Sequence, residues 1–345
     1  MSDATPEVEN VVLRALEDAD VAAAVALMTA SLGAAPGGVD REALFRWKHL
    51  ANPFGRSIAF VAELDGEIVG LRTFVRWRFR RAGTGGEVLA VRAVDTATSP
   101  IVQRKGIFSR LTTRAIDAAE SEGVAFVFNT PNDRSLPGYL KLGWHQLSDR
   151  RLRARVRRPD RLLRAAASRD LGSGAATAPP GDSELVPAAA LFEDPASVAP
   201  FASAQPAPGR LSTPRWEGYL RWRYAAGPLA YAGLTEGSPP AAVAIVRLRN
   251  RGSLREAVVC EAVCEPGEES ALRRLLGRIP SAAGADHAVT HIADGWPAAG
   301  VLSRAGYLPL PRVGMHFVVR TIAPSRPDPL ENASWALTLG DLELF

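Results

Sequence analysis

A turn between a strand and a helix carries the residue types best suited to hold a charged ligand. The segment 94–108 leaves a strand at Thr98 and reaches Gly106 just before a long amphipathic helix. Free backbone amides and the dipole at the start of a helix favour a pyrophosphate, and Arg104 and Lys105 add positive charge there. Each hydrogen bond to a charged group contributes about 1.5–3 kcal/mol, so four such bonds would anchor a cofactor. An ordinary helix start is the alternative interpretation.

The same turn resembles a family signature. Gln103-Arg104-Lys105-Gly106-Ile107-Phe108 is similar to the Gln/Arg-x-x-Gly-x-Gly/Ala motif of the GNAT superfamily of N-acetyltransferases, which binds the pyrophosphate of acetyl-coenzyme A (acetyl-CoA). Asn132 followed by Tyr139-Leu140-Lys141-Leu142-Gly143-Trp144 resembles the Asn…Tyr-x-x-x-Gly-Phe segment of that family. Phe108 departs from the motif, because the family usually has a small residue there. Either the loop lies farther from the phosphates or the ring covers the cofactor.

The resemblance implies acetyl-CoA as the cofactor and assigns roles to individual residues. The backbone of Thr96, Ala97 and Thr98 would pair with the pantetheine arm, and Asn132 would bond a pantetheine amide. The residues that would hold the pyrophosphate are Gln103, Arg104, Lys105, Gly106, Ile107 and Phe108. Tyr139 would protonate the departing thiolate, since a phenol of pKa near 10 faces a thiol of pKa near 8.5. A packed tyrosine without a chemical role is the alternative.

The acceptor amine also needs to lose a proton. An amine of pKa near 10.4 is neutral in only about one molecule in 2,500 at pH 7. Asp95 is the carboxylate we expect to face the cleft, with Glu63 and Glu87 behind it. Carboxylates on a strand surface and a proton relayed by water are the alternatives. Because no Cys or Ser with a neighbouring His is apparent, we expect the amine to attack the thioester directly.

Local patterns predict the elements that position these residues. Asp65-Gly66 predicts a hairpin between strands at 58–63 and 67–79, followed by a strand at 88–98. A helix to about residue 122 follows the signature. The predicted order continues with a strand at 125–129, a short helix at 134–142 and a strand at 144–156. This order is similar to that of the GNAT superfamily, and the predicted fold class is α/β with a mixed α+β sheet.

The second half repeats the first in diverged form. Leu220-Arg221-Trp222-Arg223 resembles Phe45-Arg46-Trp47-Lys48, and both precede a pair of strands. We therefore predict two tandem GNAT-like domains. The predicted boundaries are a catalytic domain at 1–157, a linker and irregular segment at 158–213, and a degenerate domain with a C-terminal strand at 214–345. The linker prediction rests on the Gly, Ser, Ala, Thr and Pro bias of 172–181 and 196–210.

Three further segments have less specific interpretations. Acidic residues at Glu265–Glu269 replace the signature in the second half, so we expect that half to be non-catalytic and to close an acceptor cleft. Arginines alternate along 150–158, which predicts either a solvated strand face or a cationic wall for an acidic ligand. The segment 335–345 is expected to add a strand; entry of the chain end into the active site is the alternative.

Composition excludes several classes of protein. The 345 residues carry 41 basic and 37 acidic side chains, a net charge of +4, which gives little support for nucleic-acid binding. Two cysteines exclude a disulfide scaffold and a thiolate zinc site, and we expect no metal. The first ten residues lack a signal-peptide core and no run of eighteen apolar residues occurs. We expect a cytoplasmic protein away from membranes, whose oligomeric state stays open.

The sequence thus predicts an N-acetyltransferase that moves an acetyl group from acetyl-CoA to an amine of a small molecule or peptide. Two alternatives stay open. One is a non-catalytic acyl-CoA sensor or interaction module, which the departure at Phe108 permits. The other is a tRNA-dependent aminoacyl transferase of similar tandem fold, which would not need the intact turn from Gln103 to Gly106.

Overall fold

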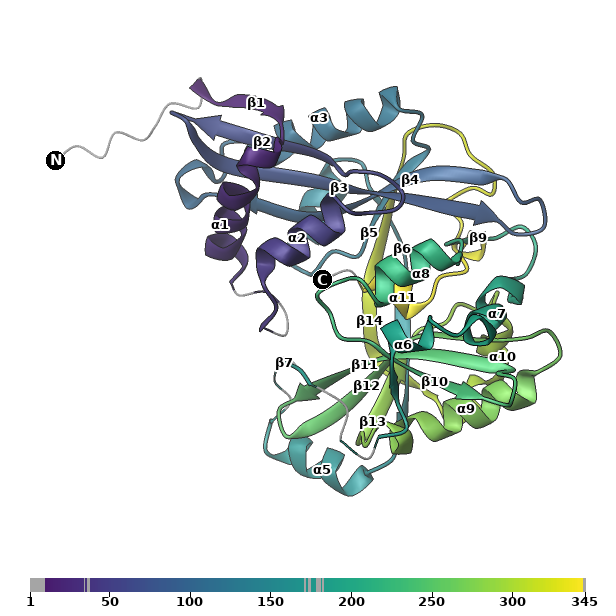
Figure 1. Cartoon of the computed structure of the whole chain (residues 1–345). Helices are drawn as coiled ribbons and strands as arrows, with labels where there is room; N and C mark the ends of the chain where they lie inside the picture. Colours follow the sequence, from purple (N-terminus) through teal and green to yellow (C-terminus); the bar gives the residue numbers. More distant parts are fainter. Residues whose placement is uncertain are drawn as a thin grey trace.

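The strands of both halves join one continuous mixed sheet (Figure 1). The computed structural model describes residues 10–33, 35, 38–170, 172, 175–177, 181 and 183–343. Along its main path the sheet order is β1-β2-β3-β4-β5-β14-β6-β13-β12-β11-β10-β8. The order is symmetric about the central pair β14 and β6, as expected for two copies of one unit. This confirms the predicted mixed α/β class.

The first half contains the elements predicted around the signature. Its strands are β1 (Val12–Ala15), β2 (Ile58–Leu64), β3 (Glu67–Arg81), β4 (Glu87–Thr98) and β5 (Phe126–Asn129). Its helices are η2 (Asp18–Asp20), α1 (Val21–Leu32), α2 (Arg41–His49), η4 (Pro100–Val102), α3 (Ile107–Ser121) and α4 (Leu136–Lys141). β1 to β4 are antiparallel neighbours, and β5 runs parallel to β4. The hairpin forms at Asp65 and Gly66, which both have positive φ.

Helices cover both faces of this half of the sheet. Val61 packs with α1 and its neighbour Ala62 packs with α3, because successive residues of a strand point to opposite faces. The approach of α3 is close at Gly70, where a Cβ atom would lie 2.9 Å from Cγ2 of Ile107 and 3.1 Å from Cδ1 of Leu111. The absence of a side chain at Gly70 therefore seats the start of α3 directly on β3.

The second half repeats this order. Its elements are α8 (Glu217–Tyr224), β10 (Ala232–Glu236), β11 (Ala242–Arg251), β12 (Leu254–Cys264), α9 (Glu269–Ala282), β13 (His287–Thr290) and α10 (Pro297–Leu302). The equivalent tryptophans of the two repeats, Trp47 and Trp222, stack with centroids 4.9 Å apart. The indole of Trp47 donates to the carbonyl of Trp222 at 2.8 Å, and the indole of Trp222 donates to the carbonyl of Trp47 at 3.1 Å. Such reciprocal contact is typical of two units related by twofold symmetry.

The last strand of each half pairs with the other half. β6 (His145–Val156) follows α4 in the chain but pairs with β13, with Arg153 opposite Thr290. β14 (Leu308–Thr321) follows α10 but pairs with β5, with Val318 opposite Asn129. β6 and β14 also pair with each other. Strand pairing therefore crosses the predicted boundary at residue 157, and the sheet of neither half is complete without the other.

The connecting segment is more ordered than its composition indicates. It contains α5 (Pro159–Ala167), β7 (Ala175–Ala176), β8 (Val186–Pro187), α6 (Ala188–Leu191), α7 (Pro195–Ser203) and β9 (Leu211–Ser212). The prediction of a mobile linker at 196–210 is wrong, because Asp194 caps the start of α7 and Phe201 is buried. Half of the predicted linker at 172–181 lies outside the described residues.

Two further predictions need correction, one about the arginine-rich face of β6 and one about the final segment of the chain. The predicted solvated face of β6 is wrong in part, because Arg153 donates to Ser303 Oγ, Arg155 to the carbonyl of Ala305 and Arg157 to that of Ala285. The predicted final strand is replaced up to residue 343 by η5 (Asn332–Ser334) and α11 (Leu339–Leu342). α11 lies between the two halves beside α8 (Figure 1).

Within the described ranges, no helix combines the length and the apolar character needed to cross a membrane. The same residues contain no group of three or more His, Cys, Asp or Glu side chains arranged to hold a metal ion.

Candidate functional site

The sheet opens between β4 and β5. The two strands pair only from Ala90 to Arg92, opposite Phe126 to Phe128, and no later ladder bond joins them in the described chain. On its other side β4 contains one extra residue relative to β3, and Asp95 in this bulge has φ of 44°. A bulge bends a strand and increases its twist. Thr96, Ala97 and Thr98, the residues predicted to pair with the pantetheine arm, therefore lie where β4 has turned away from β5.

The signature turn presents backbone amides at the start of α3. Arg104 and Gly106 both have positive φ, 62° and 76°, and no side chain caps the first turn of the helix. Successive residues that alternate between right-handed and left-handed backbone conformations turn their N–H groups toward one concave site, which binds anions. A Cβ atom on Gly106 would meet nothing within 4 Å, so glycine is required there by backbone conformation and the space beside it is open. Gln103 closes the turn by donating to the carbonyl of Thr98 at 3.2 Å.

Tyr139 lies against the signature helix with its hydroxyl buried. Its ring packs edge-on against Phe108, with centroids 5.9 Å apart, and against Trp144 at 5.3 Å. The ring of Phe108 thus turns inward onto Tyr139 rather than outward from α3. The structure brings together the signature helix and the predicted proton donor.

Arg72 on β3 joins these residues and was not predicted. Its Nη1 donates to the hydroxyl of Tyr139 at 2.9 Å and to Oγ1 of Thr96. The guanidinium lies 5.3 Å from the ring centroid of Phe108, and no described carboxylate forms an ion pair with it. Nε and Nη2 are buried without a partner in the described chain. A lone arginine within the apolar run 69–75 was the signal that sequence reasoning overlooked.

Asn132 is committed to the turn that leads into α4. Its Oδ1 accepts from the backbone amides of Arg134 and Ser135, at 3.1 and 3.0 Å, and from Oγ of Ser135 at 3.0 Å. The side chain is held in place by its oxygen, and its Nδ2 is the atom that could donate to a pantetheine carbonyl. The predicted contact between Asn132 and the pantetheine arm therefore depends on Nδ2 alone.

Two substitutions separate the structural and binding roles of Asn132. We expect Asn132→Ala to lower the free energy of unfolding by about 1 kcal/mol, because it removes the bonds to the turn. Asn132→Ser keeps a hydroxyl that can serve the turn but removes the amide donor. If Nδ2 holds the cofactor, both variants bind acetyl-CoA several-fold more weakly in calorimetric titration. Binding by Asn132→Ser as tight as that of the wild type would remove Asn132 from the site.

Asp95 is held by two buried basic side chains. Its Oδ2 accepts from Nζ of Lys48 at 2.7 Å and from Nε2 of His49 at 2.8 Å. Burial opposes ionisation, but the charge of Lys48 and the bond from His49 outweigh it and hold the pKa of Asp95 well below its usual range. A carboxylate of such low proton affinity is a poor acceptor for an ammonium proton. The prediction of Asp95 as general base is therefore corrected: it anchors α2 to β4.

The two alternative carboxylates do not lie behind Asp95. Glu63 on β2 accepts from Arg14 at 2.8 Å. Glu87 bonds with Arg78 at 3.1 Å at the start of β4, eight residues or about 26 Å of strand from Asp95. Neither occupies the opening between β4 and β5.

His49 also contacts a serine, contrary to the expectation that no Ser has a neighbouring His. Nδ1 of His49 lies 2.9 Å from Oγ of Ser57. Burial lowers the pKa of His49, so its ring is neutral; Nε2–H then donates to Asp95 and Nδ1 accepts from Ser57. Ser57 lines none of the cavities described below, so this chain of hydrogen bonds fixes the loop before β2.

The second half lacks the features of this turn. Acidic residues surround the start of α9: burial, and then the charges of Glu269, Glu268 and Glu265, raise the pKa of Cys264 to about 11. A pyrophosphate would meet like charge there.

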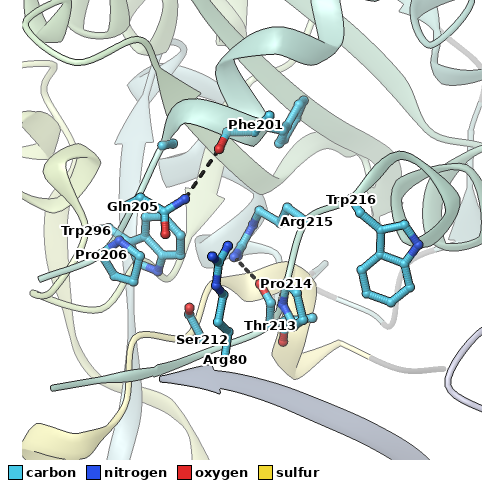
Figure 2. Close-up of a pocket in the computed structure, with 12 residues that line it drawn as sticks. Arg80, Phe201, Gln205, Pro206, Ser212, Thr213, Pro214, Arg215, Trp216 and Trp296 are labelled. Atoms are coloured by element: carbon cyan, nitrogen blue, oxygen red, sulfur yellow. Dashed lines mark hydrogen bonds between the residues drawn. The ribbon is translucent and has the colours of Figure 1, made fainter. Parts of the chain in front are cut away.

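A small pocket lies between the halves (Figure 2). Its walls come from the end of β3, from α7 and from the segments around Arg215 and Trp296. Arg215 donates to the carbonyl of Thr213 at 2.9 Å and pairs with Glu261 at 3.0 Å (Figure 2 draws the former). The volume, about 210 Å³, is below the range of about 300–1,000 Å³ usual for ligand sites. None of the candidate site residues lines it, so it is not the predicted acceptor cleft.

Comparisons with known proteins agree with the fold. Residues 12–147 match the family described as "Acetyltransferase (GNAT) domain". A GNAT N-acetyltransferase structure from Anabaena variabilis is similar over 90% of this chain and 72% of that one, at TM-score 0.59 and 11% identity. Eis1 from Mycobacterium abscessus is similar over 90% and 73%, at TM-score 0.55 and 17% identity.

A further solved structure matches the tandem architecture along almost its whole length. A tandem GNAT protein from the clavulanic acid biosynthesis pathway is similar over 91% of this chain and 99% of that one, at TM-score 0.51 and 16% identity. No curated protein sequence matches. At these identities the likeness is one of fold.

Proposed function

We propose that this chain, whose residues 12–147 form an acetyltransferase domain of the GNAT family within a tandem GNAT fold, transfers an acetyl group from acetyl-CoA to an amine. The observation that carries the proposal is the alignment of three features along one opening. These are the parting of β4 from β5, the uncapped amides at Gly106 and the buried hydroxyl of Tyr139. The acceptor is an amine of a small molecule or peptide.

Different residues around the opening bind different parts of the coenzyme. The amides after Gly106 and the side chains of Gln103, Arg104 and Lys105 hold the pyrophosphate. The backbone of Thr96 to Thr98 pairs with the pantetheine arm, which occupies the place of the missing strand. The thioester then lies toward Tyr139, because the pantetheine arm runs along β4 from the start of α3.

Arg72 and Tyr139 act when the thiolate leaves. A guanidinium can only donate, so the oxygen of Tyr139 accepts from Arg72 and the hydroxyl hydrogen points elsewhere. That hydrogen is available to the sulfur of coenzyme A. The charge on Arg72 stabilises the phenolate that remains after proton transfer.

A matched pair of glycine variants tests the binding site. Gly106 and Gly267 occupy the turns before α3 and α9, have φ of 76° and 87°, and would each place a Cβ atom in open space. A β-branched residue strains such a backbone. We expect Gly106→Val to weaken acetyl-CoA binding at least tenfold in calorimetric titration and Gly267→Val to leave it unchanged. Equal effects, or no binding by the wild type, would contradict the proposal.

Turnover separates this function from the alternatives. Release of free thiol from acetyl-CoA over a panel of primary amines shows catalysis and indicates the acceptor class. Binding without thiol release on any amine would favour a sensor, and absence of binding would favour a transferase that does not use the coenzyme.

A further inference from the structure

A second cavity lies where β6 and β13 separate. Their pairing ends at Arg153 and Thr290, and the cavity, of about 580 Å³, opens beyond that point. One wall is β6 from Ser148 to Arg153, another is the segment 291–294, and a third is 332–335. No residue of the proposed acetyl-transfer site lines it. The volume is in the range of small-molecule sites.

The lining is strongly basic. Arg150, Arg151, Arg153 and Arg210 line the cavity, and none of them pairs with a carboxylate in the described chain. The lining also contains two acids, Asp149 and Asp294. Asp149 is bound to His316 at 3.0 Å, so its charge is shared with a histidine outside the lining. Positive charge therefore exceeds negative charge within the cavity.

Arg150 is a buried cation without a counter-ion. It is 8% exposed, and its guanidinium lies 4.3 Å from the ring centroid of Phe317. Nε and Nη2 have no hydrogen-bond partner among the described residues. Burial lowers the pKa of Arg150 to about 10, which leaves the side chain charged at neutral pH. A buried charge without a partner is costly, so an anion bound at this position would offset the cost.

His291 also lines the cavity and carries a buried nitrogen without a partner in the described chain. Nδ1 lies 2.9 Å from the carbonyl of Arg151, and a carbonyl only accepts, so Nδ1 carries the hydrogen. Burial lowers the pKa of His291 to about 4, and the ring is neutral at pH 7. Nε2 is then a buried acceptor without a partner in the described chain. A ligand with an O–H or N–H group would satisfy it.

We propose that this cavity binds a small anion with phosphate or carboxylate groups and at least one hydroxyl or amine hydrogen. Arg150 and Arg151 bind the anionic group, because the guanidinium fork matches both phosphate and carboxylate oxygens. Nε2 of His291 accepts from the hydroxyl or amine. Arg153 and Arg210 add charge at the rim. The site is separate from the pyrophosphate turn and serves a second ligand.

The test uses the full chain at constant ionic strength with four probes: glucose 6-phosphate, inorganic phosphate, citrate and glucose. Calorimetric titration should show binding of at least one of the charged probes and none of glucose. A preference for glucose 6-phosphate over citrate identifies a phosphate ligand, and the reverse preference identifies a carboxylate ligand. If none of the three charged probes binds, the proposal is wrong.

Variants place the binding in the cavity. Arg150→Met keeps an unbranched apolar side chain at this buried position but removes the guanidinium that lies over Phe317, and it should weaken binding of the preferred probe at least tenfold. Arg151→Gln removes an exposed charge that forms no ion pair in the described chain, and it should weaken binding of the preferred probe at least threefold. The control Arg304→Gln changes an exposed arginine outside the cavity and should leave that binding unchanged. Equal losses in Arg151→Gln and Arg304→Gln, or a loss in Gly106→Val instead, would overturn the proposal.

The role of His291 is tested by the preference between probes with and without a hydroxyl group. If glucose 6-phosphate is the preferred probe, His291→Leu should abolish the preference of the wild type for it over inorganic phosphate. If citrate is the preferred probe, the variant should abolish the preference for citrate over tricarballylate, its analogue without the hydroxyl. Retention of that preference would show that His291 does not contact the ligand and would overturn its assignment.

Discussion

Tyr139→Phe is expected to lower the turnover of acetyl transfer by about 10²- to 10⁴-fold, the usual range for loss of a positioned proton donor. The affinity for acetyl-CoA should stay within about twofold, because the ring contacts with Phe108 and Trp144 remain. Initial rates of thiol release, with the amine that the panel identifies, measure the first quantity. Calorimetric titration measures the second.

The matched control is the same substitution at a buried tyrosine of the other half. The hydroxyl of Tyr307 donates to the carbonyl of Leu276 at 3.3 Å, and Tyr307→Phe removes one buried hydroxyl without touching the opening between β4 and β5. This control should retain turnover. Turnover by Tyr139→Phe at the level of Tyr307→Phe would show that the sulfur takes its proton from another donor.

A substitution of Arg72 tests the same proton transfer from Tyr139. Arg72→Lys keeps a charge but loses the guanidinium nitrogen Nη1 that donates to both Tyr139 and Thr96. If Arg72 stabilises the phenolate, the pH at which the rate falls on the alkaline side should move between wild type and Arg72→Lys, with acetyl-CoA affinity little changed. A purely structural role would change stability and leave the pH profile in place.

Local patterns in the sequence were sufficient for the elements that carry the signature. Asp65-Gly66 gives the hairpin, and the buried face of α3 follows from the spacing of Leu111, Ala115 and Ala119. The match of residues 12–147 to the GNAT domain confirms the family that the turn at 103–108 indicated. These features depend on neighbours within one element, which a sequence pattern records directly.

Features that depend on distant pairing could not be predicted in the same way. The alternation of arginines along β6 places Arg151, Arg153 and Arg155 on one face, but irregular pairing with β14 leaves Arg150 buried against Phe317. A bulge and an exchanged partner strand are set by contacts across more than 150 residues. The ion pair of Asp95 with Lys48 arises in the same way, since α2 and β4 are far apart in the chain.

The exchange of β6 and β14 makes the two halves depend on each other, and Trp335 shows where this dependence is strongest. Its side chain is 1% exposed and belongs to the last segment of the second half. It packs on rings that belong to β3, β5 and β14: Phe79 at 5.3 Å, Phe126 at 5.4 Å, Phe128 at 6.2 Å and Phe317 at 4.9 Å between centroids. The final segment therefore closes the core of the first half.

We expect Trp335→Ala to lower the free energy of unfolding by about 3–5 kcal/mol, the cost of removing a large buried aromatic side chain. That is a large fraction of the total of about 5–15 kcal/mol usual for a native protein. Trp216→Ala is the control, because Trp216 is 42% exposed and its removal should cost about 1 kcal/mol. Urea unfolding followed by circular dichroism measures both.

The shape of the urea unfolding curve shows whether the two halves unfold together. Since β5 needs β14 and β13 needs β6, the wild type should unfold in one transition, and Trp335→Ala should move that transition to lower urea without splitting it. Two independent domains would behave differently: loss of Trp335 would leave one transition in place and shift the other. Two separate transitions in the wild type would therefore contradict the mutual dependence of the halves, even if Trp335→Ala were as destabilising as we expect.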